Sequence, residues 1–154
     1  MIVKDTLYRH KVLRVNYTTY DLRRDQDSIN PRNHADIMVL ASEEGENAHP
    51  YWYARIQGVF HVDIRLRSNT SYNTQRFDFL WVRWFGRDLN TPSGWKHRRL
   101  QRLGFLDSDD EGAFGFLDPA LVVRSIHLIP DHLNADSFYL NMFVFHIQMD
   151  QANT

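Results

Sequence analysis

The sequence predicts a mainly β fold: a small curled sheet or partly open barrel with one or two short helices. Three observations predict it. One long segment alternates apolar and polar residues, two further segments are apolar on both alternations, and helical spacing of apolar residues is scarce. We expect the 154 residues to form a single domain, 1–154, with a core at about residues 8–149.

The first expected strands are residues 8–17 and 36–41, where the alternation is short. The pattern is strongest over residues 52–66, where one alternate set carries no charge and the other holds the charged and polar side chains. This predicts that Trp52 faces the core and that Tyr53 faces solvent. Because the segment is longer than a usual strand, we expect a bulge or bend at Gly58.

Two later segments, residues 77–85 and 138–149, are apolar on both alternations and predict strands covered on two sides. Between them, Asp118 and Pro119 begin the best helix candidate, over residues 120–124, because Asp caps helices and Pro suits their first turn. Polar, turn-forming segments at 42–50, 67–74, 88–94 and 107–112 are expected to be loops.

The composition excludes several classes of protein. Lys and Arg number 18 against 19 Asp and Glu, and 43% of the residues are hydrophobic, which excludes a polycation and an acidic disordered chain. Without cysteine there is no disulfide framework, thiolate zinc site or cysteine nucleophile. No apolar run approaches the roughly 20 residues of a membrane helix, so no membrane partner is expected. We expect an intracellular, nuclear protein.

Charge is unevenly distributed along the chain. Residues 55–102 hold ten Lys or Arg and three Asp, whereas the residues from 103 onward hold eight acidic residues and one basic residue, Arg124. Cations that neutralise phosphates beside an indole that stacks on a base indicate nucleic-acid binding. The candidate nucleic-acid-binding residues are Arg55, Arg65, Arg67, Trp95, Lys96, Arg98, Arg99 and Arg102. In the alternative, residues 93–102 form a solvated charged loop whose arginines pair with Asp107, Asp109, Asp110 and Glu111.

Aromatic residues suggest a second kind of contact, a cage for a methylated ammonium group, in which each cation–π contact contributes roughly 0.5 to 2 kcal/mol. The candidate cage residues are Tyr51, Tyr53, Trp84, Phe85 and Trp95. Trp52 is the weakest aromatic candidate because the alternation turns it inward. In the alternative, these rings fill a β core.

The chain shows little sign of catalysis. No nucleophile elbow or Walker pattern is present, and we expect no cofactor. His61 and Asp63 lie two apart on one strand face, and with His127 they have donor types suited to a divalent metal. We nevertheless expect surface or hydrogen-bonded histidines and no metal site.

Five separated segments resemble a domain of mushroom-forming (basidiomycete) fungi that occurs near the C-terminus of Kyakuja–Dileera–Zisupton-type transposon proteins. These segments are 17–24, 49–55, 80–88, 113–119 and 127–130. The resemblance implies a mobile-element origin, and the transposase chemistry of that family belongs to a separate domain. The chain departs from the family after Asn141–Val144, where the family continues into an Asp-Arg-Asp-Met-like segment.

A looser resemblance is to bromo-adjacent homology (BAH) domains, which are β-rich chromatin readers. Residues 53–56 and the Trp84–Phe85 pair occur in the order that such domains use. This resemblance implies a BAH/SH3-like barrel that binds nucleosomes or histone tails.

These observations lead us to expect a non-catalytic module that binds chromatin, with nucleic acid or a histone tail as its partner. One alternative is a self-association module, a homo-oligomer in which the basic and acidic halves of neighbouring copies pair. A second alternative is a metal-dependent enzyme that uses His61, Asp63 and His127.

Overall fold

The computed structural model describes residues 1–18, 23–42, 49–67 and 71–141, and for Arg67 and Trp95 it describes the backbone alone. The end of the expected strand at 138–149, from residue 142 onward, lies outside these residues, as do the side chains of Arg67 and Trp95. No helix in the described ranges is long and apolar enough to cross a membrane.

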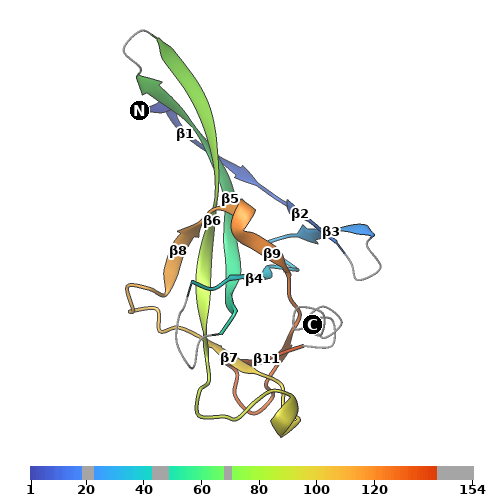
Figure 1. Ribbon diagram of the computed structural model, residues 1–154. Coiled ribbons are helices and arrows are strands. Elements are labelled where there is room, and N and C mark those ends of the chain that lie inside the picture. Colours follow the sequence, from blue (N-terminus) through green and yellow to red (C-terminus); the bar gives the residue numbers. More distant parts are fainter. Residues whose placement is uncertain (19–22, 43–48, 68–70, 142–154) are drawn as a thin grey trace.

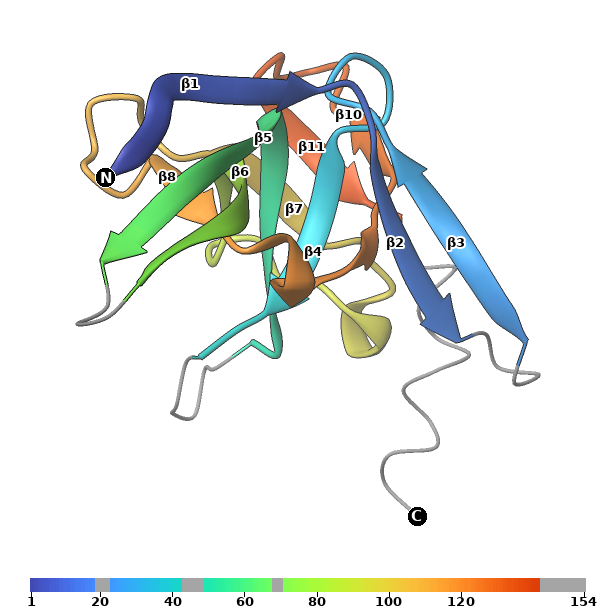
Figure 2. The same cartoon turned by 90° about the horizontal axis from the view of Figure 1, so that it is seen from above.

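The described residues form a mainly β fold whose large sheet curls into a half-barrel, which confirms the predicted class (Figures 1 and 2). The strands are β1 (Ile2–His10), β2 (Leu13–Thr18), β3 (Arg24–Ile29), β4 (Asp36–Leu40), β5 (Tyr51–Arg67), β6 (Tyr72–Arg87), β7 (Arg102–Phe105), β8 (Phe114–Leu117), β9 (Val122–Ser125), β10 (Leu128–Pro130) and β11 (Ser137–Leu140). The main path runs β10-β11-β7-β6-β5-β4-β9, while β1 also pairs with β5 and β8 with β6. Strands β2 and β3 form a separate two-stranded ladder.

The centre of the sheet is the long antiparallel ribbon of β5 and β6. Its register shifts between Ile56 and Gly58, which confirms the predicted bulge at Gly58. Figure 1 shows the upper part of this ribbon, together with the start of β1, extending beyond the half-barrel.

Part of the predicted inward and outward sets is wrong. Tyr53, expected to face solvent, is 3% exposed, whereas Trp52, expected to face the core, is 37% exposed. Tyr53 is buried because the lower part of β5 has apolar neighbours on both faces. Beyond Gly58, the extra residue at the bulge exchanges the two faces of the strand.

Two apolar clusters cover opposite faces of the lower sheet. In the first, Val15 and Ile29 of the β2–β3 ladder pack with Ile56, Leu80 and other residues of the sheet. In the second, Met38, Tyr53 and Phe85 pack with side chains of the far strands β7, β10 and β11, which the curl brings round. The curled shape therefore lets one sheet bury both of its faces.

The helix expected over residues 120–124 is shorter than predicted. Asp118 caps it as expected, because its carboxylate accepts a hydrogen bond from the Ala120 N–H at 2.8 Å. However, the helix is a single 3₁₀ turn, η2 (Pro119–Leu121), and the chain then enters β9. Pairing of Val122 with β4 outweighs the local helical preference. A second 3₁₀ turn, η1 (Trp95–His97), lies in the connection between β6 and β7.

Candidate functional site

Aromatic side chains gather around a pocket of about 370 Å³ beside the first residues of β5 and the last residues of β6. The pocket is lined by Tyr51, Trp52, Tyr53, Trp84, Phe85, Gly86, Arg87, Leu89, Leu106 and Gly112. Four of the five candidate cage residues are therefore brought together, and the side chain of the fifth, Trp95, lies outside the described residues. Trp52, the weakest candidate in the sequence, belongs to the same lining.

The strand register places these aromatic residues at one level of the β5–β6 ribbon, on both of its faces. Tyr53 pairs with Phe85, and both belong to the second apolar cluster, whereas Trp84, which pairs with Ala54, packs against the first cluster on the opposite face. The Trp52 and Trp84 rings lie edge to face with centroids 6.0 Å apart. Burial raises the pKa of the Tyr53 hydroxyl well above its usual range, so this phenol stays neutral, although the charge of Arg87 acts in the opposite direction.

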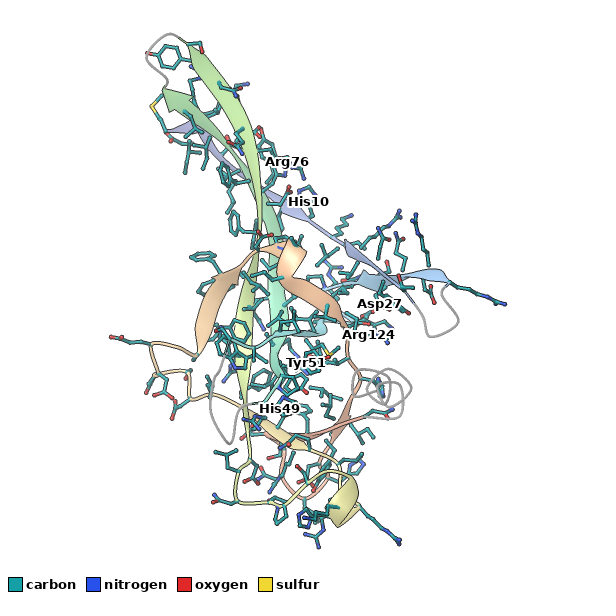
Figure 3. All side chains as sticks on the ribbon, viewed as in Figure 1. His10, Asp27, His49, Tyr51, Arg76 and Arg124 are labelled. Carbon is teal, nitrogen blue, oxygen red and sulfur yellow. The ribbon has the colours of Figure 1, made fainter. Side chains whose placement is uncertain are left out.

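His49 supports the tyrosine side of the pocket. Its ring lies 5.8 Å from the Tyr53 ring, and its Nδ1 is 3.2 Å from the Tyr51 backbone nitrogen. Figure 3 shows His49 and Tyr51 side by side in the lower half of the molecule.

Gly115 in β8 makes room for the Trp84 indole. A Cβ atom at position 115 would lie 3.0 Å from Trp84 Nε1, closer than ordinary van der Waals contact. The indole therefore rests against the backbone of β8, and a side chain there would push it away.

An acidic loop leaves and rejoins the sheet beside this pocket. The Leu106 N–H donates to the Trp84 carbonyl at 3.2 Å, and the Trp84 N–H donates to the Ala113 carbonyl at 2.9 Å. Both ends of the loop are thus held by Trp84, and Leu106 and Gly112 line the pocket. The loop's four acidic residues, Asp107, Asp109, Asp110 and Glu111, are all exposed.

Two of the predicted basic residues are half-buried and form ion pairs with carboxylates of the protein. Arg55 donates two hydrogen bonds to the Asp36 carboxylate, at 2.6 and 2.9 Å, and lies over the rings of Phe85, Phe105 and Phe138. Arg102 lies 3.1 Å from the Asp131 carboxylate and 3.5 Å from that of Asp88. Folding therefore supplies these two arginines with carboxylates from other strands and loops, which reduces the charge that they offer to an open basic face.

The remaining basic candidates are spread over the molecule. Lys96, Arg98 and Arg99 are exposed in and after η1, the short yellow helix at the bottom of Figure 1. Arg65 lies near the outer end of the β5–β6 ribbon, with its guanidinium 5.9 Å from the Tyr72 ring. Among the described side chains, no ion pair joins the basic segment 96–102 to the acidic loop. The alternative in which these residues pair with each other has no ion pair to support it among the described side chains.

The structure does not bring His61, Asp63 and His127 together as one set of ligands. His61 lies in β5, whereas His127 lies between β9 and β10, and Asp63 pairs with Arg76 farther along the ribbon. Instead, the ligand atoms of His61, His10 and Asp78 lie within 4.8 Å of one another. The sequence did contain a signal for Asp78: strands separated by one short polar segment form a hairpin, in which residues equally far from the turn face each other.

The comparisons with known proteins add no relatives: no family model, curated protein or solved structure matches this chain.

Proposed function

We propose that this chain is a non-catalytic module that binds a cationic segment of a partner protein, such as the basic tail of a histone, in its aromatic pocket. One observation carries the proposal: Tyr51, Tyr53, Trp84 and Phe85 line the same pocket, beside a loop with four carboxylates. The resemblance to chromatin-reading BAH domains agrees with this kind of partner.

The charges around the pocket favour a cation. The faces of aromatic rings carry partial negative charge and attract ammonium groups, most strongly when the ring is an indole. The acidic loop, which begins and ends at the pocket, adds four negative charges, while Arg87 contributes one positive charge to the lining. A lysine or methyllysine side chain can therefore approach through a negative field and end against the rings.

A nucleic-acid partner fits the same surface less well. Its phosphates would meet the acidic loop at the pocket. Of the predicted basic residues, Lys96, Arg98 and Arg99 lie in and after η1, Arg65 lies near the outer end of the ribbon, and Arg55 and Arg102 are paired with carboxylates. Nucleic-acid binding is therefore the competing outcome of the test.

The test compares one basic peptide in three forms: with unmodified lysine, with trimethyllysine and with acetyllysine. Isothermal titration calorimetry measures the affinity of each. We expect trimethyllysine to bind more tightly than unmodified lysine, and acetyllysine to bind worst because its charge is lost. A cation–π contribution of roughly 0.5 to 2 kcal/mol corresponds to a preference of about 2- to 30-fold for the trimethyllysine peptide over the acetyllysine peptide. Equal affinity for the acetylated peptide would contradict the proposal.

Two sets of variants place the peptide on the surface. Trp52→Ala is expected to weaken binding of the peptide because Trp52 is the most accessible ring of the pocket. The matched control is Tyr72→Ala, at an exposed tyrosine on the outer part of the ribbon, which should leave the affinity unchanged. Replacing Asp109, Asp110 and Glu111 by their amides should also weaken binding, with Asp136→Asn as the control.

The same proteins are then titrated with duplex DNA at low salt. Tight binding of DNA that is lost on mutation of Lys96, Arg98 and Arg99, together with no binding of any peptide, would overturn the proposal in favour of a nucleic-acid partner.

A further inference from the structure

Three polar side chains from three neighbouring strands, β1, β5 and β6, converge at one point of the sheet: His10, His61 and Asp78. His61 pairs with Asp78 of β6 on one side and with Tyr8 of β1 on the other. His10, two residues after Tyr8, turns its ring to the same point, so that its Nε2 lies 2.6 Å from His61 Nδ1. Figure 3 shows His10 beside the middle of the ribbon, near Arg76.

We propose that His10, His61 and Asp78 bind a divalent transition-metal ion of the zinc class. Two imidazole nitrogens and one carboxylate oxygen are donors that zinc and the late first-row metals favour, and three protein ligands leave a further position for water. All three ligand atoms lie within 4.8 Å of one another.

The site needs only a small movement to accept the ion. Two nitrogens bound to one tetrahedral zinc are about 3.3 Å apart, given bonds of about 2.0–2.1 Å. The two imidazoles would therefore separate by about 0.7 Å from their hydrogen-bonded contact, and the metal would replace the proton that lies between them.

The surroundings orient the ligands in advance. The Tyr8 ring stacks on the His61 ring with centroids 4.5 Å apart and planes 7° apart, which limits rotation of the imidazole. Both histidines are half-buried on strands rather than on loops, while Asp78 is exposed and admits the ion.

Arg76 holds the Asp78 carboxylate in an ion pair. Its guanidinium donates to Asp78 at 2.6 and 3.0 Å, so it competes with a metal for the same oxygens. Asp63 pairs with Arg76 across the ribbon and offers the guanidinium a second carboxylate when a metal takes Asp78. Loss of the Arg76 charge is therefore expected to tighten metal binding rather than weaken it.

A bound ion would connect β1 to the ribbon. The β1–β5 register is interrupted between Ile2 and Leu7, so the end of β1 that carries Tyr8 and His10 is where the strand pairs continuously. A metal ion that binds only the folded state raises its stability. Here the ion would stabilise the pairing between the end of β1 and β5.

The experiment uses the full chain without a histidine tag, treated with a chelator that is then removed. Zn²⁺ is titrated by calorimetry, and Co²⁺ is followed by its visible absorption. We expect one ion per chain, and a loss of affinity of at least about tenfold in His10→Gln, in His61→Gln and in Asp78→Asn. His97→Gln, an exposed histidine outside the cluster, is the matched control. Arg76→Gln should bind Zn²⁺ more tightly than the parent protein.

A second measurement guards against variants that merely fail to fold. In the unsubstituted protein, Zn²⁺ should shift the imidazole nitrogen resonances of two histidines and leave the others in place, while circular dichroism checks the fold of each variant. Absence of binding by the unsubstituted protein, or binding that survives in folded His10→Gln and His61→Gln, would overturn the proposal.

Discussion

The indoles of Trp52 and Trp84 meet edge to face, with ring centroids 6.0 Å apart and planes inclined at 80°. One belongs to β5 and the other to β6, and both line the aromatic pocket. Such a pair contributes about 0.5–1.5 kcal/mol beyond the area that it buries. The two rings therefore hold each other in place at the side of the pocket that meets solvent.

The position of Trp84 can be tested through its neighbour in β8. Gly115→Ala places a methyl group 3.0 Å from Trp84 Nε1, and we expect the indole to move and the affinity for the trimethyllysine peptide to fall. Gly112→Ala is the control, since a Cβ atom at this pocket-lining glycine meets nothing within 4 Å. Calorimetry with both variants measures the effect, and equal affinities would show that the indole does not contact the ligand.

We predict that Arg55 stabilises the folded state. Arg55→Ala leaves the Asp36 carboxylate without its two hydrogen bonds and removes a cation from three phenyl rings. We expect the free energy of unfolding in urea to fall by about 2 kcal/mol. Arg55→Lys should recover only part of the loss, because an ammonium group cannot form the paired contact. Arg65→Ala is the control, and a similar loss there would argue against a special role for Arg55.

The core prediction concerns Leu80, whose side chain is fully buried in the first apolar cluster. Leu80→Ala is expected to lower the free energy of unfolding by about 3 kcal/mol, through lost burial and the cavity left behind. Leu133→Ala, at a side chain that is 98% exposed, should have almost no effect. Urea unfolding of the two variants distinguishes them.

Stability should depend on pH through Asp78. Hydrogen bonds from Arg76 lower the pKa of Asp78 below its usual value of 3.8, helped by the charges of Arg76, His61 and His10. A carboxyl with a lowered pKa in the folded state stabilises the protein above the unfolded value, and this contribution is lost as the pH falls through the folded value. We therefore expect stability to decrease below a pH of about 4.

The variant Arg76→Gln tests this assignment. Between pH 5 and pH 2, the range in which carboxylates titrate, its unfolding free energy should decrease less than that of the parent protein. An unchanged pH profile would place the acid sensitivity at other carboxylates, such as Asp88, whose pKa is lowered by hydrogen bonds from Thr91 and Asn90.

Several features of the fold could be predicted because they depend on residues close together in the chain. The alternation over 52–66 identified β5, the length of that segment identified the bulge at Gly58, and the order Asp118-Pro119 identified a capped turn. For the candidate site, the sequence selected four aromatic residues that do line one pocket.

The rest depended on partners far along the chain. Arg55 reaches a carboxylate 19 residues away, and His10 meets His61 at a separation of 51 residues. A period of two shows that two faces exist but does not show what covers each of them. Trp52 was therefore assigned to the core and Tyr53 to solvent, the reverse of what the structure shows.

The amino-acid sequence alone determined that this chain is built of strands, where the longest one bends, and which aromatic residues were worth following. Only the tertiary structure decided which arginines keep an open charge, which rings reach solvent, and which histidines meet. The physical reason is that strand formation and turn chemistry are set by neighbouring residues, whereas charge neutralisation and burial are set by strand pairing and by the curl of the whole sheet.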